Sequence, residues 1–205
     1  MKTKLAVLLA ALLLILLFTS GCCVLLSNLL PQKPQPTLEQ VVETEVPVEK
    51  KVSFGDFETT DIYGETFTQE LFSDYKLTMV NIWGTFCGPC INEMPELGEI
   101  AKEYSEKGVK IVGIVVDATD NSGKIVDSQV ELAKELVEKT GAEYTHLLPS
   151  VDLIKARLAR VSAIPHTLFV DKDGFLVGKA ITGSQSKQEW QKIIDKYLED
   201  VNEGA

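Results

Sequence analysis

The sequence predicts an α/β domain in which helices cover both faces of a mixed sheet. Two observations favour this class. Apolar, β-rich segments alternate with segments whose apolar residues recur at every third or fourth position, as strands and amphipathic helices do. The series ends in a hairpin and a helix, and about 150 residues are available for the domain, which is enough for one full core.

The first half of the domain is predicted to contain a hairpin, two strands and a helix. Short β-rich pieces between 54 and 67 flank a glycine turn. Residues 76–83 form an apolar run typical of a buried strand. Residues 91–104 carry an apolar stripe at helical spacing. Val109–Val116 is almost continuously β-branched, which favours a central parallel strand covered on both faces.

The second half follows the same alternation. It is predicted to contain a helix at 127–140, a strand at 144–148, a helix at 151–161, a hairpin at 167–180 and a C-terminal helix. Gly141 is expected to end the first of these helices. Ser186 and Glu189 form a capping box that opens the last one.

The N-terminus is predicted to attach the protein to a membrane. Lysines near the start precede an apolar core, Leu5 to Phe18, as in an export signal or an anchor. Residues 18–22 resemble a bacterial lipobox in which Cys22 would be lipidated. Residues 5–30 are also long enough to cross a bilayer as a signal-anchor. Both modes predict localisation at the cell membrane, with the domain outside the cytoplasm.

Three regions follow from this pattern. Residues 1–30 are the signal peptide with lipobox or the signal-anchor, 31–51 a Pro/Glu-rich linker, and 52–203 the domain. Prolines in the linker disfavour packing and favour extended backbone. The chain has 20 basic and 30 acidic residues, a formal net charge of −10. This balance argues against nucleic acid or anionic lipid as a partner.

The segment Trp83-Gly84-Thr85-Phe86-Cys87-Gly88-Pro89-Cys90 carries the chemistry. Two cysteines separated by two residues can close a disulfide, or one can attack a partner disulfide while the other resolves the mixed disulfide. Cys87 falls where a strand gives way to a helix N-terminus, which favours a thiolate, so it is the predicted nucleophile. Cys90 is the predicted resolving thiol. Gly88 and Pro89 set the turn between them.

Other uses of the cysteine pair are poorly supported. A closed zinc site needs four ligands, and the rest of the chain offers only Cys22, Cys23, His146 and His166, without metal-ligand spacing. A purely structural disulfide across two residues would constrain little of the unfolded chain. Redox exchange that needs no cofactor and no metal is therefore the prediction.

The segment resembles the active site of the thioredoxin superfamily, and its context resembles the membrane-tethered TlpA/ResA-like branch. The resemblance covers residues 52–203. It implies a thioredoxin fold with an N-terminal β-hairpin at 54–67 and a central helix–strand insertion at about 125–148, where that branch elaborates the minimal fold.

The resemblance also implies roles for residues outside the motif. Pro165 is expected to be the cis-proline that faces the dithiol, with the backbone of Ile164 presented to a substrate strand; the alternative is a trans-proline that ends the preceding helix. Glu93 matches a glutamate near the dithiol of ResA-like proteins; the alternative is an acid that complements the helix dipole. Asn81 stands where thioredoxin has a buried aspartate. Because an asparagine cannot relay a proton, Glu93 is the candidate carboxylate for the resolving thiol.

Three more side chains are expected around the dithiol. Trp83 and Phe86 are expected to form an apolar collar that contacts the substrate, although core packing would explain Trp83 equally well. His166 follows Pro165 where the family commonly has threonine. Because no partner for it is identifiable, it is expected to be a solvated polar residue rather than one that tunes the dithiol.

Together these features predict an extracytoplasmic thiol-disulfide oxidoreductase. It would exchange disulfides with exported proteins, act as a reductant in a role like cytochrome c maturation, and draw electrons from a membrane or envelope donor. The domain is expected to be monomeric. Two alternatives remain open. One is a thiol peroxidase, because peroxiredoxins share this elaborated fold and Thr85 loosely matches their threonine. The other is a Sco-type copper-binding assembly factor, with His146 as the third ligand.

Overall fold

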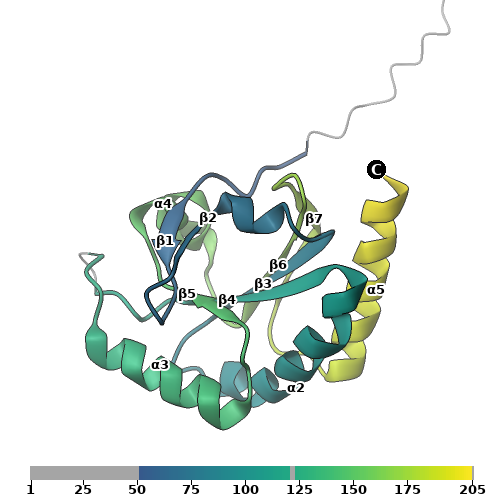
Figure 1. The fold of residues 1–205 in the computed structure, drawn as a ribbon. Coiled ribbons are helices and arrows are strands. Elements are labelled where there is room, and N and C mark those ends of the chain that lie inside the picture. The colour runs from purple at the N-terminus through teal and green to yellow at the C-terminus, as the bar shows by residue number, and fades with distance from the viewer. Residues whose placement is uncertain (1–50, 121–122, 205) are drawn as a thin grey trace, which may run out of the picture. The chain divides into compact units, whose positions relative to one another are not determined.

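A five-stranded sheet in the order β5-β4-β3-β6-β7 organises residues 51–120 and 123–204, which the computed structural model describes (Figure 1). The strands are β3 (Leu77–Trp83), β4 (Val109–Val115), β5 (Thr145–Leu147), β6 (His166–Asp171) and β7 (Leu176–Thr182). β3, β4 and β5 run parallel to one another, whereas β6 is antiparallel to both β3 and β7. The predicted mixed sheet is confirmed.

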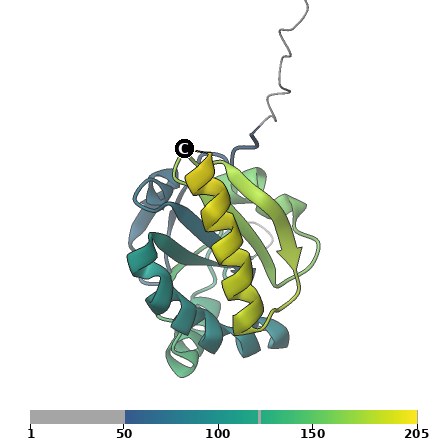
Figure 2. The same ribbon diagram turned by 90° about the vertical axis from the view of Figure 1, so that its right-hand side faces the viewer.

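Helices cover both faces of this sheet, as predicted. One face packs against the three long helices, which are α2 (Gly88–Tyr104), α3 (Asp127–Thr140) and α5 (Lys187–Glu203). Figure 2 shows α5 running across this face. The opposite face carries the N-terminal hairpin of β1 (Glu58–Thr60) and β2 (Thr66–Thr68), the 3-10 helix η1 (Gln69–Phe72) and α4 (Val151–Ala156). Further 3-10 helices are η2 (Ser105–Lys107) and η3 (Leu158–Arg160).

Side chains of the central strand β3 point to both faces of the sheet and contribute to the core on each side. Met79 and Trp83 point to the face of the long helices, whereas Val80 and Ile82 point to the hairpin and α4. Every residue of β3 is buried, including its two polar residues Thr78 and Asn81, as expected for a central strand that is covered on both faces.

The helix predicted at 151–161 is shorter in the structure. α4 begins with Ser150 as its N-cap and ends at Ala156. Arg157 then leaves helical geometry with φ −136° and ψ −50°, and η3 follows. The predicted cap of the last helix is confirmed, because the Ser186 side chain accepts the backbone N–H of Glu189.

Strand register explains where a site can form. Ile82 pairs with His166 across β3 and β6, and Trp83 pairs with Val115 across β3 and β4. The carboxyl ends of β3 and β4 therefore meet the start of β6 at one edge of the sheet. The loop that follows Trp83 lies at this edge with Pro165.

The predicted membrane segment, its candidate lipidation site Cys22 and the linker up to residue 50 lie outside the described residues. Within 51–120 and 123–204, the helices are too short or too polar for any of them to cross a membrane.

Candidate active site

The two cysteines of the motif lie at the N-terminus of α2 and form a disulfide with a Cα–Cα distance of 5.3 Å. Cys87 is the N-cap in extended geometry, and its Sγ accepts the backbone N–H of Cys90 at 3.3 Å. Pro89 lies in the first turn, where its missing N–H costs no intrahelical hydrogen bond. Negative charge on Cys87 would therefore be stabilised by the helix N-terminus.

The two sulfur-bearing residues differ in access. Cys87 is 6% exposed and Cys90 is 1% exposed. Gly88 and Pro89 between them are both exposed. An approaching disulfide would meet Cys87 first, in agreement with the order of roles predicted from the sequence.

Pro165 follows a cis peptide bond from Ile164, directly before β6. The alternative of a trans-proline that ends a helix is wrong, since η3 already ends at Arg160. The carbonyl of Pro165 accepts the N–H of Gly183 at 2.9 Å. By contrast, the backbone of Ile164 makes no hydrogen bond within the described residues. That backbone is open to an incoming strand.

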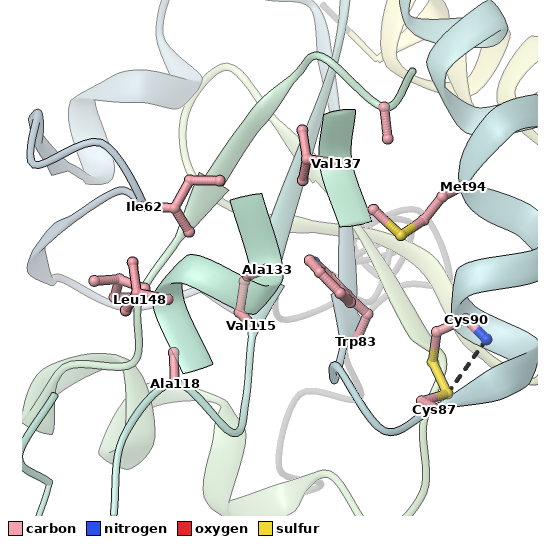
Figure 3. Close-up of a cluster of buried hydrophobic side chains, with 12 residues drawn as sticks. Ile62, Trp83, Cys87, Cys90, Met94, Val115, Ala118, Ala133, Val137 and Leu148 are labelled. Carbon is pink, nitrogen blue, oxygen red and sulfur yellow. Dashed lines mark hydrogen bonds between the residues drawn. A yellow bond between two sulfur atoms is a disulfide. The ribbon is translucent and has the colours of Figure 1, made fainter. Parts of the chain in front are cut away.

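Trp83 and Phe86 do not form the predicted collar. Trp83 is fully buried and lies in the core between the disulfide and Ala133 of α3 (Figure 3). It offers no surface to a substrate, so the core-packing alternative accounts for it. Phe86 is 73% exposed, one residue before Cys87. The apolar surface beside the dithiol therefore comes from Phe86 and not from Trp83.

Glu93 lies in a buried hydrogen-bond network. Its Oε1 accepts a hydrogen bond from Asn81 Nδ2 at 3.1 Å, and its Oε2 accepts from Gln185 N–H at 3.2 Å and Trp190 Nε1–H at 3.3 Å. The residue is 3% exposed, and burial raises the pKa of its carboxyl although these hydrogen bonds oppose the rise. A solvated acid that only complements the helix dipole is excluded by this burial.

Both histidines have hydrogen-bond partners within the domain. His166 is half-buried, and its Nδ1 lies 3.0 Å from Thr182 Oγ1, so it has a partner and is not simply solvated. Burial lowers its pKa. His146 is buried, with Nδ1 accepting from Trp83 Nε1 at 3.1 Å and Nε2 bonded to the Ala142 carbonyl at 2.9 Å. Both ring nitrogens are occupied, so the copper alternative gains no support.

A second hydrogen-bond network holds the loop that carries Cys87, and no pattern in the sequence predicts it. The backbone N–H of Thr85 donates to Asp117 Oδ1 at 3.0 Å, and its hydroxyl lies 2.5 Å from Asp117 Oδ2. The same hydroxyl lies 2.9 Å from the side-chain amide of Gln129 on α3. Because these partners engage the hydroxyl, the resemblance of Thr85 to a peroxidase threonine gains no support either.

Comparisons with known proteins agree with this geometry. The AhpC/TSA family model matches residues 51–179. The thiol-disulfide oxidoreductase ResA of Bacillus thuringiensis subsp. konkukian is 31% identical over 152 residues, which cover 72% of this chain and 80% of ResA. ResA of Geobacillus kaustophilus is 29% identical over 148 residues, with coverage of 71% and 74%.

Solved structures share the fold. A thiol:disulfide interchange protein of the thioredoxin family from Chlorobium tepidum aligns with a TM-score of 0.61 at 22% identity, covering 73% of this chain and 97% of that protein. The fold is therefore thioredoxin-like, with the predicted hairpin and helix–strand insertion. Combined with the sequence relatives, this shows that the chain belongs to the AhpC/TSA family and, within it, to the ResA-type thiol-disulfide oxidoreductases.

Proposed function

We propose that this oxidoreductase works outside the cytoplasm as a reductant of disulfides in exported proteins. The observation that carries the proposal is the asymmetry of the dithiol. Cys87 caps the helix and is the more exposed of the two cysteines, whereas Cys90 is almost completely buried, and the backbone of Ile164 before the cis-proline makes no hydrogen bond to the described residues. This arrangement suits a nucleophile that receives a protein strand and a second thiol that acts only afterwards.

The exchange takes two steps from the reduced enzyme. The Cys87 thiolate attacks one sulfur of the substrate disulfide, and the other substrate sulfur leaves as a thiolate that takes up a proton. The Cys90 thiol then loses its proton and attacks Cys87 Sγ, which releases the second substrate thiol. Two electrons have passed to the substrate, and the enzyme is left with the Cys87–Cys90 disulfide.

Glu93 is the proposed acceptor of the Cys90 proton. It lies three residues after Cys90 on α2, a spacing that brings two positions to one helix face. Its pKa is raised by burial, so the carboxylate holds a proton more readily than a solvated glutamate does. A base with a pKa closer to the working pH transfers protons more effectively.

The location and the electron supply belong to the same proposal. The basic start and the apolar core of the N-terminus support export and attachment through lipidated Cys22 or through a membrane span. A membrane or envelope dithiol would then reduce the Cys87–Cys90 disulfide after each cycle. If the protein works as a reductant, the reduction potential of its dithiol should lie near that of thioredoxin, about −270 mV. A strong oxidant would have a reduction potential near about −120 mV.

A trapping experiment tests the exchange. Replacing Cys90 with serine removes the resolving thiol, so a partner attacked by Cys87 should stay covalently bound and be identifiable after non-reducing electrophoresis. The matched control is the Cys87→Ser/Cys90→Ser double variant, which should trap nothing. If the two variants give the same pattern in cells, exchange with exported proteins through Cys87 is excluded.

A further inference from the structure

The side chain of Asn81 lies behind the dithiol with one of its two ends unpaired. Asn81 is on the central strand β3 and is 1% exposed. Its Nδ2 donates to Glu93 Oε1 at 3.1 Å and to Thr167 Oγ1 at 3.2 Å. Its Oδ1 is buried and has no hydrogen-bond partner among the described residues. Because an unpaired buried amide oxygen is costly, a role for this end of the side chain is expected.

The two oxygens of the Glu93 carboxylate have different partners. Oε2 accepts from the backbone N–H of Gln185 and from the indole N–H of Trp190. Both groups can only donate, so a proton on Oε2 would meet two donors and no acceptor. Among the described residues, Oε1 accepts only from the amide of Asn81. When Glu93 takes up a proton, Oε1 is therefore the oxygen that carries it.

The amide of Asn81 can pair with both charge states of Glu93. A side-chain amide has a donor end and an acceptor end of nearly the same shape, so it can turn over within the same volume. After the turn, Oδ1 takes the place of Nδ2 and accepts from Glu93 Oε1–H and from the Thr167 hydroxyl, which rotates to donate. In both orientations one end of the amide is unpaired within the described part of the chain, so the proton on Glu93 decides between them.

We propose that the Asn81 amide turns over each time Glu93 gains or loses the proton of Cys90. The inference rests on the proposed exchange and adds a positioning residue to its second step. As Cys90 attacks, its sulfur gives its proton to Glu93 Oε1 and bonds to Cys87 Sγ, while the substrate sulfur leaves with the electron pair of the broken mixed disulfide and is protonated by water. When a donor dithiol later opens the Cys87–Cys90 disulfide, Glu93 returns the proton to Cys90.

Nuclear magnetic resonance of the ¹⁵N,¹³C-labelled full-length chain in detergent micelles follows the turn directly. The oxidised form is used because its cysteines do not titrate. The side-chain NH₂ signals of Asn81, assigned through its own β-carbon, should move between two positions as the pH changes. The midpoint should lie above the ordinary pKa of a glutamate, because burial raises the pKa of Glu93. In Glu93→Gln, whose NH₂ group always faces Asn81, the signals should stay at the acidic position at every pH.

Two other titratable groups interact with Glu93 through charge. They are Glu96 on the same helix and Tyr144, which lies just before β5. Burial raises the pKa of Tyr144 above its ordinary value, so Tyr144 stays neutral in this range. Glu96→Gln removes the other charge. This variant should keep the transition of the Asn81 signals, with a midpoint only slightly lower in pH than that of wild type.

Single-turnover reduction of a peptide disulfide measures the consequence for the reaction. In Asn81→Leu the charged form of Glu93 loses a strong hydrogen bond and the acid loses a weaker one. The inflection in the pH profile of the second step should therefore rise by about one pH unit, a tenfold change in proton affinity. Thr78→Val is the matched control. Thr78 is buried on the same strand, its hydroxyl has no partner among the described residues, and its odd spacing from Asn81 places it on the other face of the sheet, so this variant should keep the wild-type inflection.

The outcomes separate the turn of the amide from the exchange itself. Asn81 signals that do not change while Glu93 titrates, or that stay at the alkaline position in Glu93→Gln, overturn the turn. A folded Asn81→Leu variant with the same inflection as Thr78→Val overturns its role in the reaction. A wild type that reduces no peptide disulfide at any pH overturns the proposed function instead, and the spectra, which need no substrate, still decide whether the amide turns.

Discussion

The indole N–H of Trp83 donates a hydrogen bond to Nδ1 of His146 at 3.1 Å, across the strand that lies between them. An indole nitrogen can only donate, so Nδ1 carries no proton and Nε2–H points to the Ala142 carbonyl. The tautomer of His146 is thus fixed by its two partners. Because Trp83 packs against the disulfide (Figure 3), this pair supports the core behind the dithiol.

This pairing predicts that acid destabilises the domain through His146. Burial lowers the pKa of His146 to about 4, compared with about 6.5 when unfolded, and protonation would abolish its acceptor for Trp83. Between these values the unfolded chain binds more protons. Stability therefore falls as the pH drops from about 6.5 to about 4, by on the order of 3 kcal/mol in total.

Urea unfolding at a series of pH values checks the prediction. His146→Asn offers an oxygen in place of Nδ1 and does not titrate, so its unfolding free energy should vary less across this window. Glu93 has the opposite effect: its raised pKa means that stability falls as pH rises above its unfolded value. The variant must therefore be compared with wild type at each pH. Parallel curves for the two proteins would disprove the assignment to His146.

A second prediction concerns Gly113 on β4, which lies directly between the paired residues. A Cβ at this position would overlap Nδ1 of His146 and lie 3.0 Å from Nε1 of Trp83. Gly113→Ala should therefore lower the unfolding free energy by about 2 kcal/mol or more, because the core must shift or lose this hydrogen bond. Gly88→Ala is the control for stability, since a Cβ there would meet no atom within 4 Å among the described residues outside its chain neighbours and the backbone of its own helix. Thermal unfolding that is equal for the two variants would contradict this account.

Local patterns were sufficient to predict most of the fold. The helix expected at 127–140 has those bounds in the structure, because its apolar stripe and the following Gly141 are both local signals. The helix expected at 151–161 breaks at Arg157, whose side chain is buried with its guanidinium 5.4 Å from the ring of Phe54. That contact joins residues about a hundred positions apart, so no local pattern reports it.

The candidate site, like the fold, was predicted only in part. Cys87 and Cys90 were identified from their motif, and the Ile164–Pro165 pair from the family resemblance. The pairing of Trp83 with His146 was not predicted, since it depends on a glycine in the strand between them. Apolar periodicity also cannot separate a tryptophan that contacts substrate from one that fills the core. Only the exposed fraction of the side chain distinguishes these two cases.

A third prediction concerns the anchor of the active-site loop. Thr85→Val keeps the shape of the side chain and removes the hydroxyl that bonds Asp117 and approaches Gln129. This should cost about 1–3 kcal/mol of stability, because the Asp117 carboxylate loses a hydrogen-bond donor in a partly buried place. Thr85→Ser retains the hydroxyl and should stay close to wild type. The denaturant midpoints of wild type, Thr85→Val and Thr85→Ser test whether the hydroxyl stabilises the loop. If the serine variant is as unstable as the valine variant, the methyl group of Thr85 matters instead.

The last prediction separates a chemical from a structural role for Glu93. In Glu93→Gln the side-chain oxygen can still accept from Gln185 N–H and Trp190 Nε1–H. Its NH₂ group would then face Asn81, whose Oδ1 is buried without a hydrogen-bond partner among the described residues and can accept once that amide turns over. The variant removes a buried charge and keeps every hydrogen bond of the carboxylate satisfied. It should therefore be at least as stable as wild type at neutral pH.

Its chemistry should nevertheless slow. Without a carboxylate to accept the Cys90 proton, the rate at which the second substrate thiol is released should fall by at least about tenfold. General acid–base catalysis usually contributes about a hundredfold or more, so a tenfold loss is the minimum expected. The pH dependence of that step should also lose the inflection that Glu93 provides above its ordinary pKa. Single-turnover release measured from pH 4 to 9 tests both points. Glu96→Gln, on the same helix and half-buried, is the control: it should keep the wild-type rate and the inflection, which should move only slightly to lower pH because the Glu96 charge has the smallest of the effects that shift the pKa of Glu93. A Glu93→Gln variant with an unchanged rate and pH profile would restrict Glu93 to holding α2 against Gln185 and Trp190.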